Sequence, residues 1–334
     1  MEKLDEIGEI SEYKFDNILD IINVIIKYKG NKKRKYNSDL ERLTDCIIPL
    51  KKLNNLIGME TIKKNIIDQV LFYSQDLNTN EMMHTCLTGP PGVGKTTLGK
   101  ILAELYCSLG FLETDNFKVV SKVDLIAGYV GQTAIKTQKV LKSAIGGVLF
   151  IDEAYSLGCG GSEDSDSYGK ECIDTINKFL SENTSNFIMI IAGYREELDR
   201  CFFTLNKGLT RRFPWNYDIS KYTSMDLKKI FIHQVIENNW TFDENVKFNN
   251  YQLLDSIFDT NSSTSKDISL FEQNGGDTLI LFDKTKICHS RRVFGKRKRF
   301  KKILDINDIK LGMELMKSFK NKNKKSEPPY GMYL

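Results

Sequence analysis

Residues 85–98 read TCLTGPPGVGKTTL, a stretch in which glycines stand between the segments TCLT and KTTL. Thr85–Thr88 has the composition of a short strand, and a helix is expected from Lys95 through Tyr106. Between them, Gly89–Thr96 fits the pattern G-x-x-x-x-G-K-S/T. Glycines let such a loop wrap closely, so that successive backbone N–H groups cradle phosphate oxygens. The stretch therefore predicts a phosphate-binding loop, and its flanking strand and helix argue against a chance glycine-rich turn.

The residues of this loop are expected to bind ATP and Mg²⁺ in different ways. Lys95 reaches the β- and γ-phosphates, and the Thr96 hydroxyl ligates Mg²⁺. The N-terminus of the following helix adds a partial positive charge. The nucleotide-binding residues expected here are Gly89, Pro90, Pro91, Gly92, Val93, Gly94, Lys95, Thr96 and Thr97.

A second motif, VLFIDE at 148–153, reads as a buried strand that ends in two carboxylates. Asp152 is expected to hold Mg²⁺ through water, because Mg²⁺ keeps most of its hydration shell. Glu153 is expected to orient and polarise the attacking water, the positioning role that dominates phosphoryl transfer. An apolar run before two acids is weak evidence alone. Its place after the phosphate loop, in an alternating strand and helix pattern, predicts a site that hydrolyses ATP.

Strands and helices alternate along the chain up to Asp218, with further strands expected at 118–120 and 187–192. This alternation predicts an α/β fold with a mostly parallel, three-layer sheet. A small all-α lid domain is expected after it, with a surface loop at 261–266. The expected organisation is a helical extension at 1–52, the α/β nucleotide-binding domain at 53–219, the lid domain at 220–320 and a basic flexible tail at 321–334.

Positive charge is concentrated near the end of the chain. The net charge of the whole sequence is +4, but Lys284–Lys325 holds sixteen Lys and Arg residues against three acids. Such asymmetry indicates an anionic partner for this region. The segment 291–302, RRVFGKRKRFKK, is a candidate for binding nucleic acid. We identify no aromatic stacking residues and no base-reading motif in it, so a solvated helix face is the preferred interpretation.

Other side chains argue against metal, disulfide and membrane functions. The seven cysteines are scattered without a C-x-x-C pair, which favours reduced, packed thiols over a zinc site or a disulfide framework. The acidic, glycine-rich stretch 158–169 lacks the ligand spacing of a Ca²⁺ loop and is expected to be a mobile surface loop. No apolar run approaches a membrane span and the first residues do not resemble a secretory signal, so a soluble cytoplasmic protein is expected.

Read with their neighbours, the two motifs resemble the CbxX/CfqX group of AAA+ ATPases, which includes red-type rubisco activase and is related to stage V sporulation protein K. The resemblance runs from Leu53 to Phe213, and CHSRRVF at 288–294 adds a weaker match. The matching segments, in the order of the family, are LNNLIGMETIKK, CLTGPPGVGKTTL, DLIAGYVGQTAIKT, AIGGVLFIDEAYSL, IIAGYREELDR and GLTRRF.

The resemblance implies roles for residues outside the two motifs. Ile57 and Gly58 fall where the family packs adenine. Tyr129, Val130 and Gly131 match the aromatic–apolar–glycine loop that lines the central pore of the ring and grips a substrate. A tyrosine suits that task because it offers a large contact area at low entropic cost. The alternative for Tyr129 is a side chain packed in the core.

Three more roles follow from the resemblance. Arg212 aligns with the arginine that projects into the ATP site of the neighbouring subunit, with the adjacent Arg211 as its rival. Arg291 aligns with the second sensor on the lid, with Arg292 as its rival. Many AAA+ relatives place Asn or Thr as the first sensor, whereas this chain has Tyr194, whose hydroxyl is the candidate replacement.

The implied function is Mg²⁺-dependent ATP hydrolysis by a ring, a hexamer in the family, that remodels a protein client. The alternative is a nucleic-acid motor or loader that uses the basic C-terminal region. A nucleotide-binding structural protein without turnover is disfavoured by the intact pair Asp152 and Glu153. The motifs encode no particular client, and neither rubisco nor a membrane is implied.

Overall fold

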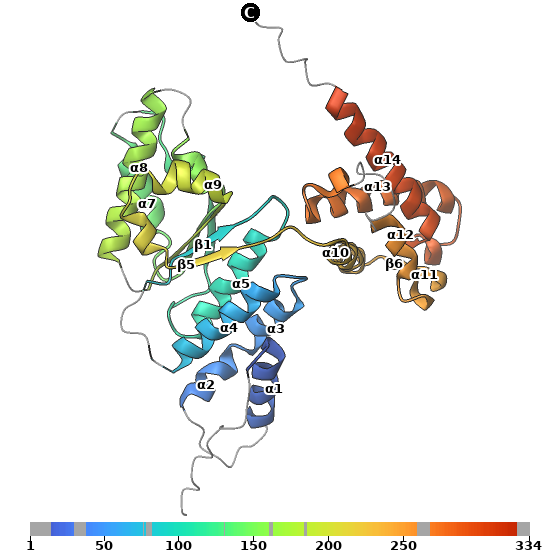
Figure 1. The fold of residues 1–334 in the computed structure, drawn as a ribbon, viewed down its shortest axis with the longest axis horizontal. Helices are drawn as coiled ribbons and strands as arrows, with labels where there is room; N and C mark the ends of the chain where they lie inside the picture. Colours follow the sequence, from blue (N-terminus) through green and yellow to red (C-terminus); the bar gives the residue numbers. More distant parts are fainter. Residues whose placement is uncertain are drawn as a thin grey trace, which may run out of the picture. The chain divides into compact units, whose positions relative to one another are not determined.

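The computed structural model describes residues 15–29, 38–75, 77, 82–129, 131–159, 163–183, 186–258 and 268–325. The chain forms two compact units. Figure 1 shows them as a ribbon coloured from the N-terminus to the C-terminus. The first unit comprises Met1–Gly89 and Gly94–Ser220, and the second comprises Pro90–Val93 and Lys221–Leu334. The apex of the glycine-rich loop is therefore counted with the second unit.

The first unit is built on a five-stranded parallel sheet in the order β2-β3-β4-β1-β5. Every residue of the three interior strands is buried, as expected for a parallel sheet covered on both faces. The prediction of a mostly parallel α/β sheet is confirmed. The strands are β1 (Thr85–Thr88), β2 (Phe117–Val120), β3 (Val148–Ile151), β4 (Ile188–Gly193) and β5 (Trp215–Asp218).

Helices cover both faces of this sheet, with α7 and α8 on one side and α4 and α5 on the other (Figure 1). Side chains of β3 alternate accordingly. Leu149 and Ile151 join the core that contains Ile173 of α8. Phe150 points to the opposite face, where a Cβ on Gly99 of α5 would lie 2.8 Å from its ring. The helices are α4 (Glu60–Ser74), α5 (Lys95–Ser108), α6 (Lys122–Leu125), α7 (Thr133–Lys142), α8 (Glu163–Glu182) and α9 (Arg195–Leu198).

The N-terminal helices α1 (Ile18–Lys29), α2 (Ser38–Asp45) and α3 (Ile47–Asn55) belong to the first unit. Ile21 and Ile25 of α1 are buried, and α1 packs against α3 and α4. Helix α3 in turn packs on α5, the helix that follows the glycine-rich loop. The extension expected from helical spacing is thus packed into the core of this unit.

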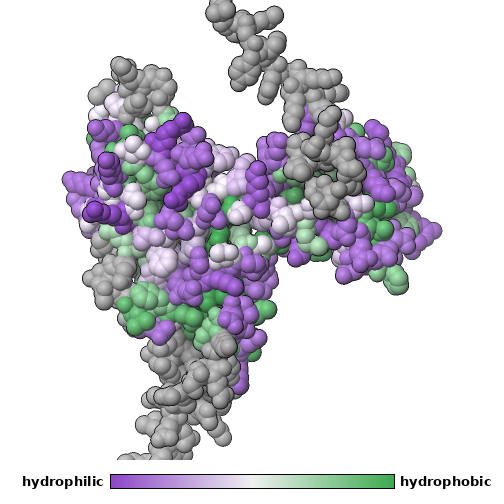
Figure 2. Space-filling view, in the orientation of Figure 1, coloured by the Kyte–Doolittle hydropathy of each residue, from purple (hydrophilic) through white to green (hydrophobic). Residues whose placement is uncertain are grey.

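The described part of the second unit is mainly helical, as predicted, and contains one short parallel strand pair, β6 (Thr241–Phe242) with β7 (Ile303–Leu304). Its core is rich in phenylalanine and includes Phe231, Phe242 and Phe282. On the face shown in Figure 2, hydrophilic residues cover most of this unit. Its helices are α10 (Ser224–Glu237), α11 (Glu244–Phe248), α12 (Asp255–Phe258), α13 (Gly275–Val293) and α14 (Ile306–Lys325).

Several local expectations differ from the structure. Strand β5 is not among the strands predicted from the sequence. Its sequence WNYD is not apolar, and at the sheet edge only Tyr217 of its four side chains is buried. The expected loop at 158–169 is wrong from Glu163 onward, where α8 begins. That helix continues through polar sequence because its later turns bury Ile173 and Leu180. Helix α14 likewise runs to Lys325 rather than giving way to a tail at 321.

Two further expectations concern a surface loop and membrane-spanning helices. The surface loop expected at 261–266 lies outside the described residues. Among the helices that are described, none combines the length and apolar character needed to cross a lipid bilayer.

Candidate nucleotide site

The glycine-rich loop adopts backbone angles that only glycine adopts easily. Gly89, Gly92 and Gly94 have φ values of 146°, 72° and 90°. A Cβ on Gly89 would lie 2.5 Å from the carbonyl oxygen of Ile219, so a side chain there is also excluded by space. The loop thus leaves β1 and enters α5 at Lys95 through glycines in backbone conformations that residues with side chains rarely adopt.

Lys95 is held at the start of α5 with its side chain turned back over the loop. Its Nζ donates a hydrogen bond of 2.8 Å to the carbonyl oxygen of Gly89. Burial lowers the pKa of Lys95, and the nearby carboxylates of Glu153 and Asp152 act in the opposite direction. A phosphate bound here would add more negative charge and favour the ammonium form.

Asp152 and Glu153 follow β3 at the carboxyl edge of the sheet. The backbone N–H of Glu153 donates to Asp152 Oδ1 at 3.1 Å, and Glu153 has a left-handed φ of 50°. Burial, reinforced by the charge of Asp152, raises the pKa of Glu153. Its Oε2 is buried and has no hydrogen-bond partner among the described residues. A buried carboxylate oxygen without a protein partner is the feature expected of a group that orients water.

These residues together fit a magnesium nucleotide. Lys95 is a cation at the loop, the Thr96 hydroxyl follows it on α5, and Asp152 and Glu153 supply carboxylates after β3. Thr96 and Asp152 are the residues that would hold Mg²⁺, which when bound would neutralise negative charge on the phosphates. The carboxyl ends of β1 and β4 also meet directly, since Gly89 N–H donates to Gly193 O at 3.3 Å.

Tyr194, the candidate first sensor, lies beside the loop lysine. It follows β4 at the N-terminus of α9, and its ring centre is 5.5 Å from Lys95 Nζ. The ring also lies 5.9 Å from that of Tyr155. The position of Tyr194 therefore brings its aromatic face to the loop lysine.

The candidate adenine residues precede α4. Ile57 and Gly58 are half-buried, and Gly58 has a φ of 70°. The buried Lys63 anchors this connection, because its Nζ donates to the carbonyl oxygen of Leu56 at 2.7 Å. A role in packing adenine remains a prediction.

The structure distinguishes the two candidate arginine fingers. Arg212 donates to the carbonyl oxygen of Gly208 at 2.8 Å and to the Ser181 hydroxyl. Its Nε is buried without a partner among the described residues. Arg211 is exposed. Arg212 is thus positioned by its own subunit, whereas Arg211 extends into solvent.

The two candidate lid sensors at the end of α13 differ in the same way. Arg292 donates to both oxygens of the buried Asp308, with NH2 at 2.7 Å from Oδ2. Burial raises the pKa of Asp308, but hydrogen bonds from Arg292, the Asp305 backbone and His289 outweigh it and lower that pKa. Arg291 is exposed and makes no ion pair among the described residues. Arg292 therefore has a structural task within the second unit, and Arg291 is available for another.

The candidate pore loop joins α6 to α7. Tyr129 is 75% exposed, which excludes the alternative that it packs in the core. Gly131 has a φ of 77°, and a Cβ added there would meet no described atom within 4 Å, while Val130 lies outside the described residues. The loop is closed at its base, where Ala127 N–H donates to the Thr133 hydroxyl at 3.3 Å.

The interpretation of the basic segment 291–302 as a helix face without aromatic residues is wrong. Helix α13 ends at Val293, and Phe294 beyond it is 92% exposed. Phe300 is 40% exposed, with the Arg299 guanidinium 4.8 Å from its ring centre. Two aromatic side chains therefore lie among the basic residues, and the letters of the sequence already contain this signal.

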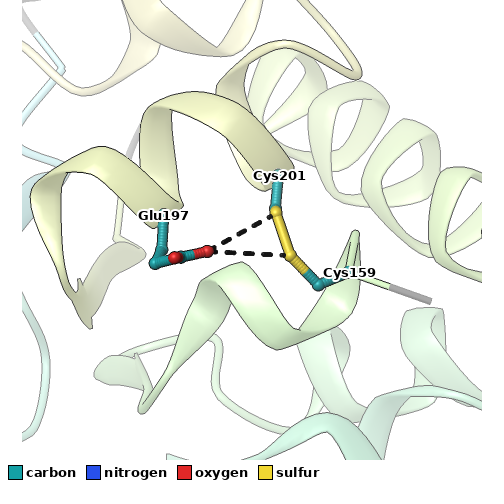
Figure 3. A group of neighbouring side chains, drawn as sticks. All are labelled: Cys159, Glu197 and Cys201. Carbon is teal, nitrogen blue, oxygen red and sulfur yellow. Dashed lines mark hydrogen bonds between the residues drawn. A yellow bond between two sulfur atoms is a disulfide. The ribbon is translucent and has the colours of Figure 1, made fainter. Parts of the chain in front are cut away.

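The expectation that all cysteines are reduced is also wrong. Cys159 and Cys201 form a disulfide with a Cα–Cα distance of 5.4 Å (Figure 3). They are 42 residues apart, so spacing along the chain could not reveal the pair. The remaining five cysteines are free, and three of them are buried, as expected for packed thiols.

Comparisons with known proteins agree with this geometry. The family model for AAA, the ATPase family associated with various cellular activities, matches residues 85–219. The chain is 36% identical to the putative cfxQ-like protein R730 of Acanthamoeba polyphaga mimivirus over 333 residues, which cover 99% of this chain and 78% of that protein. It is 34% identical to stage V sporulation protein K of Bacillus subtilis over 223 residues, 64% of this chain and 67% of that protein.

Among solved structures, the chain is similar to the FIGL-1 AAA domain in complex with ADP. The TM-score is 0.55 at 18% identity, over 81% of this chain and 89% of that one, so this likeness concerns the fold alone. The sequence relationship to the mimivirus protein goes further, because it combines 36% identity with 99% of this chain. The expected resemblance is confirmed: the chain belongs to the CfxQ/CbxX-like members of the AAA family, and it is an ATPase.

Proposed function

We propose that this ATPase assembles into a ring and uses Mg²⁺-dependent ATP hydrolysis to remodel a protein client. The observation that carries the proposal is the exposure of Tyr129, at 75% on a loop whose base is hydrogen-bonded closed. A large aromatic side chain in solvent has no stabilising task within its own fold and suits contact with another chain.

Within each subunit the residues divide the work of hydrolysis. Lys95 places positive charge at the β- and γ-phosphates, and Glu153 offers a buried, unpaired carboxylate oxygen to orient water. Thr96 and Asp152 are proposed to hold Mg²⁺. Tyr194 beside Lys95 is proposed to sense the γ-phosphate.

Between subunits, an arginine from one is proposed to complete the ATP site of its neighbour. Arg212 is favoured by its alignment directly before Phe213, and its bonds to Gly208 and Ser181 would hold the guanidinium in a defined position. Arg211 is the more exposed of the two and is its rival. Arg291 is proposed as the lid sensor, because Arg292 is engaged with Asp308.

The direct test of client remodelling separates binding of the client by Tyr129 from ATP hydrolysis by Glu153. Glu153→Gln should trap ATP-bound rings on their client in a pull-down, and adding Tyr129→Ala to that variant should release the client. Tyr129→Ala alone should keep the basal ATPase rate, while Tyr129→Phe should retain the grip. Equal recovery of bound proteins with and without Tyr129 would contradict a role in gripping.

A second candidate function, a nucleic-acid-dependent ATPase, is favoured by one observation. Phe294 is 92% exposed beside the cluster of Lys296, Arg297, Lys298 and Arg299. Stacking aromatics among basic residues are typical of single-strand binding. ATPase stimulation by DNA or RNA, lost on neutralising this cluster but unaffected by Tyr129→Ala, would make this the main function. Such stimulation should fall steeply with salt, because phosphate contacts release counterions.

A further inference from the structure

The disulfide joins two segments that directly follow catalytic strand ends. Cys159 lies just beyond the short helix η1 (Ala154–Leu157), which continues from Glu153 at the end of β3. Cys201 lies in η2 (Asp199–Phe203), which continues through α9 from Tyr194 at the end of β4. The bond therefore links the segment after the catalytic carboxylates to the segment after the candidate first sensor.

The packing of these segments keeps the two cysteines together independently of their bond. A Cβ on Gly158 would lie 1.7 Å from the carbonyl oxygen of Cys201, so the two backbones are in close contact. A Cβ on Gly169 would similarly lie 2.1 Å from the carbonyl oxygen of Leu157, which presses η1 against α8. Because glycine contacts set this approach, the sulfurs remain neighbours when the bond is reduced, and re-formation needs little rearrangement.

The two cysteines differ in their access to solvent. Cys159 is exposed, whereas Cys201 is only 7% exposed. A bulky reagent can therefore reach Cys159 first, and the buried Cys201 can then displace it. This is the arrangement of an attacking thiol with a resolving thiol.

We propose that Cys159 and Cys201 are a reversible thiol–disulfide modification site whose co-reactant is the disulfide of a small thiol, such as oxidised glutathione. The Cys159 thiolate attacks one sulfur of the small disulfide and forms a mixed disulfide, releasing one small thiol. The Cys201 thiolate then attacks Cys159 Sγ, closes the protein disulfide and releases the second small thiol. Overall, one protein dithiol and one small disulfide yield one protein disulfide and two small thiols.

Oxidation of this site slows ATP hydrolysis. Glu153 precedes η1 with a left-handed φ of 50°, a conformation that the surrounding packing must hold. The disulfide adds a covalent link to that packing at the opposite end of the same segment, so it restricts any movement of the Glu153 carboxylate that involves this backbone. Reduction removes the restraint while leaving the packed site intact.

The experiment uses the full chain equilibrated in buffers of defined oxidised-to-reduced glutathione ratio, with dithiothreitol for reversal. Peptide mapping without reduction should find the Cys159–Cys201 link, and the ATPase rate should fall by about threefold or more as that link forms. Dithiothreitol should restore the rate. Cys201→Ser should accumulate glutathione on Cys159, and Cys159→Ser should be insensitive to oxidation.

Matched controls and the competing explanation complete the test. Cys107→Ser and Cys288→Ser remove partly exposed free thiols and should leave the response unchanged. In the reduced protein, Glu197 could join the two sulfurs as a metal ligand, because its Oε2 lies 4.0 Å from Cys159 Sγ and 3.9 Å from Cys201 Sγ. Glu197→Ala should therefore keep the glutathione response.

Three results would overturn the proposal. The first is a Cys159–Cys201 link that forms without any change in ATPase rate. The second is glutathione that stays on Cys159 in the wild-type chain without transfer to Cys201. The third is a response that appears only with added Zn²⁺ and is lost in Glu197→Ala, which would assign the cluster to a metal.

Discussion

The ammonium nitrogen of Lys95 lies 5.5 Å from the centre of the Tyr194 ring, and the same nitrogen donates to the carbonyl oxygen of Gly89. Lys95 therefore contacts both Gly89 at the start of the glycine-rich loop and Tyr194 just after β4. A cation over a tyrosine ring is stabilised by the negative face of that ring. The proposed role of Tyr194 therefore has two separable parts, one through its hydroxyl and one through the contact of its ring with Lys95.

Substitutions at Tyr194 should separate these two contributions. Tyr194→Phe keeps the ring over Lys95 but removes the hydroxyl, so it should lower kcat by about tenfold with little change in nucleotide affinity if the hydroxyl senses the γ-phosphate. Tyr194→Ala should also weaken ATP binding. Steady-state kinetics and nucleotide titration measure the two effects, with Tyr155→Phe as the control. Wild-type kcat in Tyr194→Phe would leave the first-sensor role to another residue.

Loss of Lys95 and loss of Glu153 should have different kinetic signatures. Lys95→Ala removes charge at the phosphates and should weaken ATP binding. Glu153→Gln keeps the shape of the side chain and should preserve binding, yet slow hydrolysis by about a hundredfold or more because water is no longer oriented. Fluorescent-nucleotide titration and phosphate release measure these effects. Unchanged turnover in Glu153→Gln would contradict the proposal that Glu153 orients the attacking water.

Hydrolysis should depend on assembly if an arginine acts in trans. Arg212→Ala should form rings and bind ATP but hydrolyse it poorly, and mixing it with Lys95→Ala subunits should partly restore the rate. Restoration is expected because one partner keeps an intact ATP site and the other keeps an intact finger. The same mixing with Arg211→Ala is the matched comparison. If only Arg211→Ala shows the defect and its rescue, the exposed arginine is the finger.

Asp308 should make the stability of the second unit depend on pH. Its folded pKa is lowered, although burial opposes the shift, because Arg292, the Asp305 backbone and His289 hydrogen-bond to its carboxylate. A lowered folded pKa contributes stability that is present above the unfolded pKa and is lost as pH falls through the folded value. Acid unfolding followed by circular dichroism should show this loss below the ordinary range of an aspartate.

The corresponding substitution provides the control for that pH dependence. Asp308→Asn leaves Arg292 without its carboxylate partner and should destabilise the second unit by about 3 kcal/mol at neutral pH. Asp283→Asn is the matched control, since Asp283 is exposed and pairs with Lys286 on its own helix. Similar losses for the two variants in denaturant titration would show that the buried network contributes little.

Local sequence patterns predict those parts of the fold that depend on the backbone preferences and the apolar character of a few consecutive residues. The strand, glycine turn and helix around Lys95 follow from residue types whose backbone preferences act over a few positions. The strand ending at Asp152 follows from an apolar run buried on both faces. Strand β5 is not predicted in this way, because a polar edge strand is stabilised by pairing with β1 rather than by its own composition.

Tertiary contacts distinguish adjacent arginines that the sequence alone leaves as equal candidates for one role. Arg291 and Arg292 are adjacent and chemically identical, and only the burial of Asp308 beside Arg292 separates their roles. Arg211 and Arg212 are separated in the same way by the bonds of Arg212 to Gly208 and Ser181. No property of a single residue carries this information, because it depends on partners that fold in from distant segments.

Sequence alone predicts the phosphate loop, the two carboxylates after β3 and the alternating order of strands and helices that makes the sheet parallel. Each rests on backbone or burial preferences encoded within a short window. The tertiary structure alone decided that Cys159 meets Cys201. Their segments follow neighbouring strands β3 and β4, and the close backbone contact at Gly158 brings the sulfurs together across 42 residues. Chain proximity of this kind is a consequence of strand order, which no local pattern specifies.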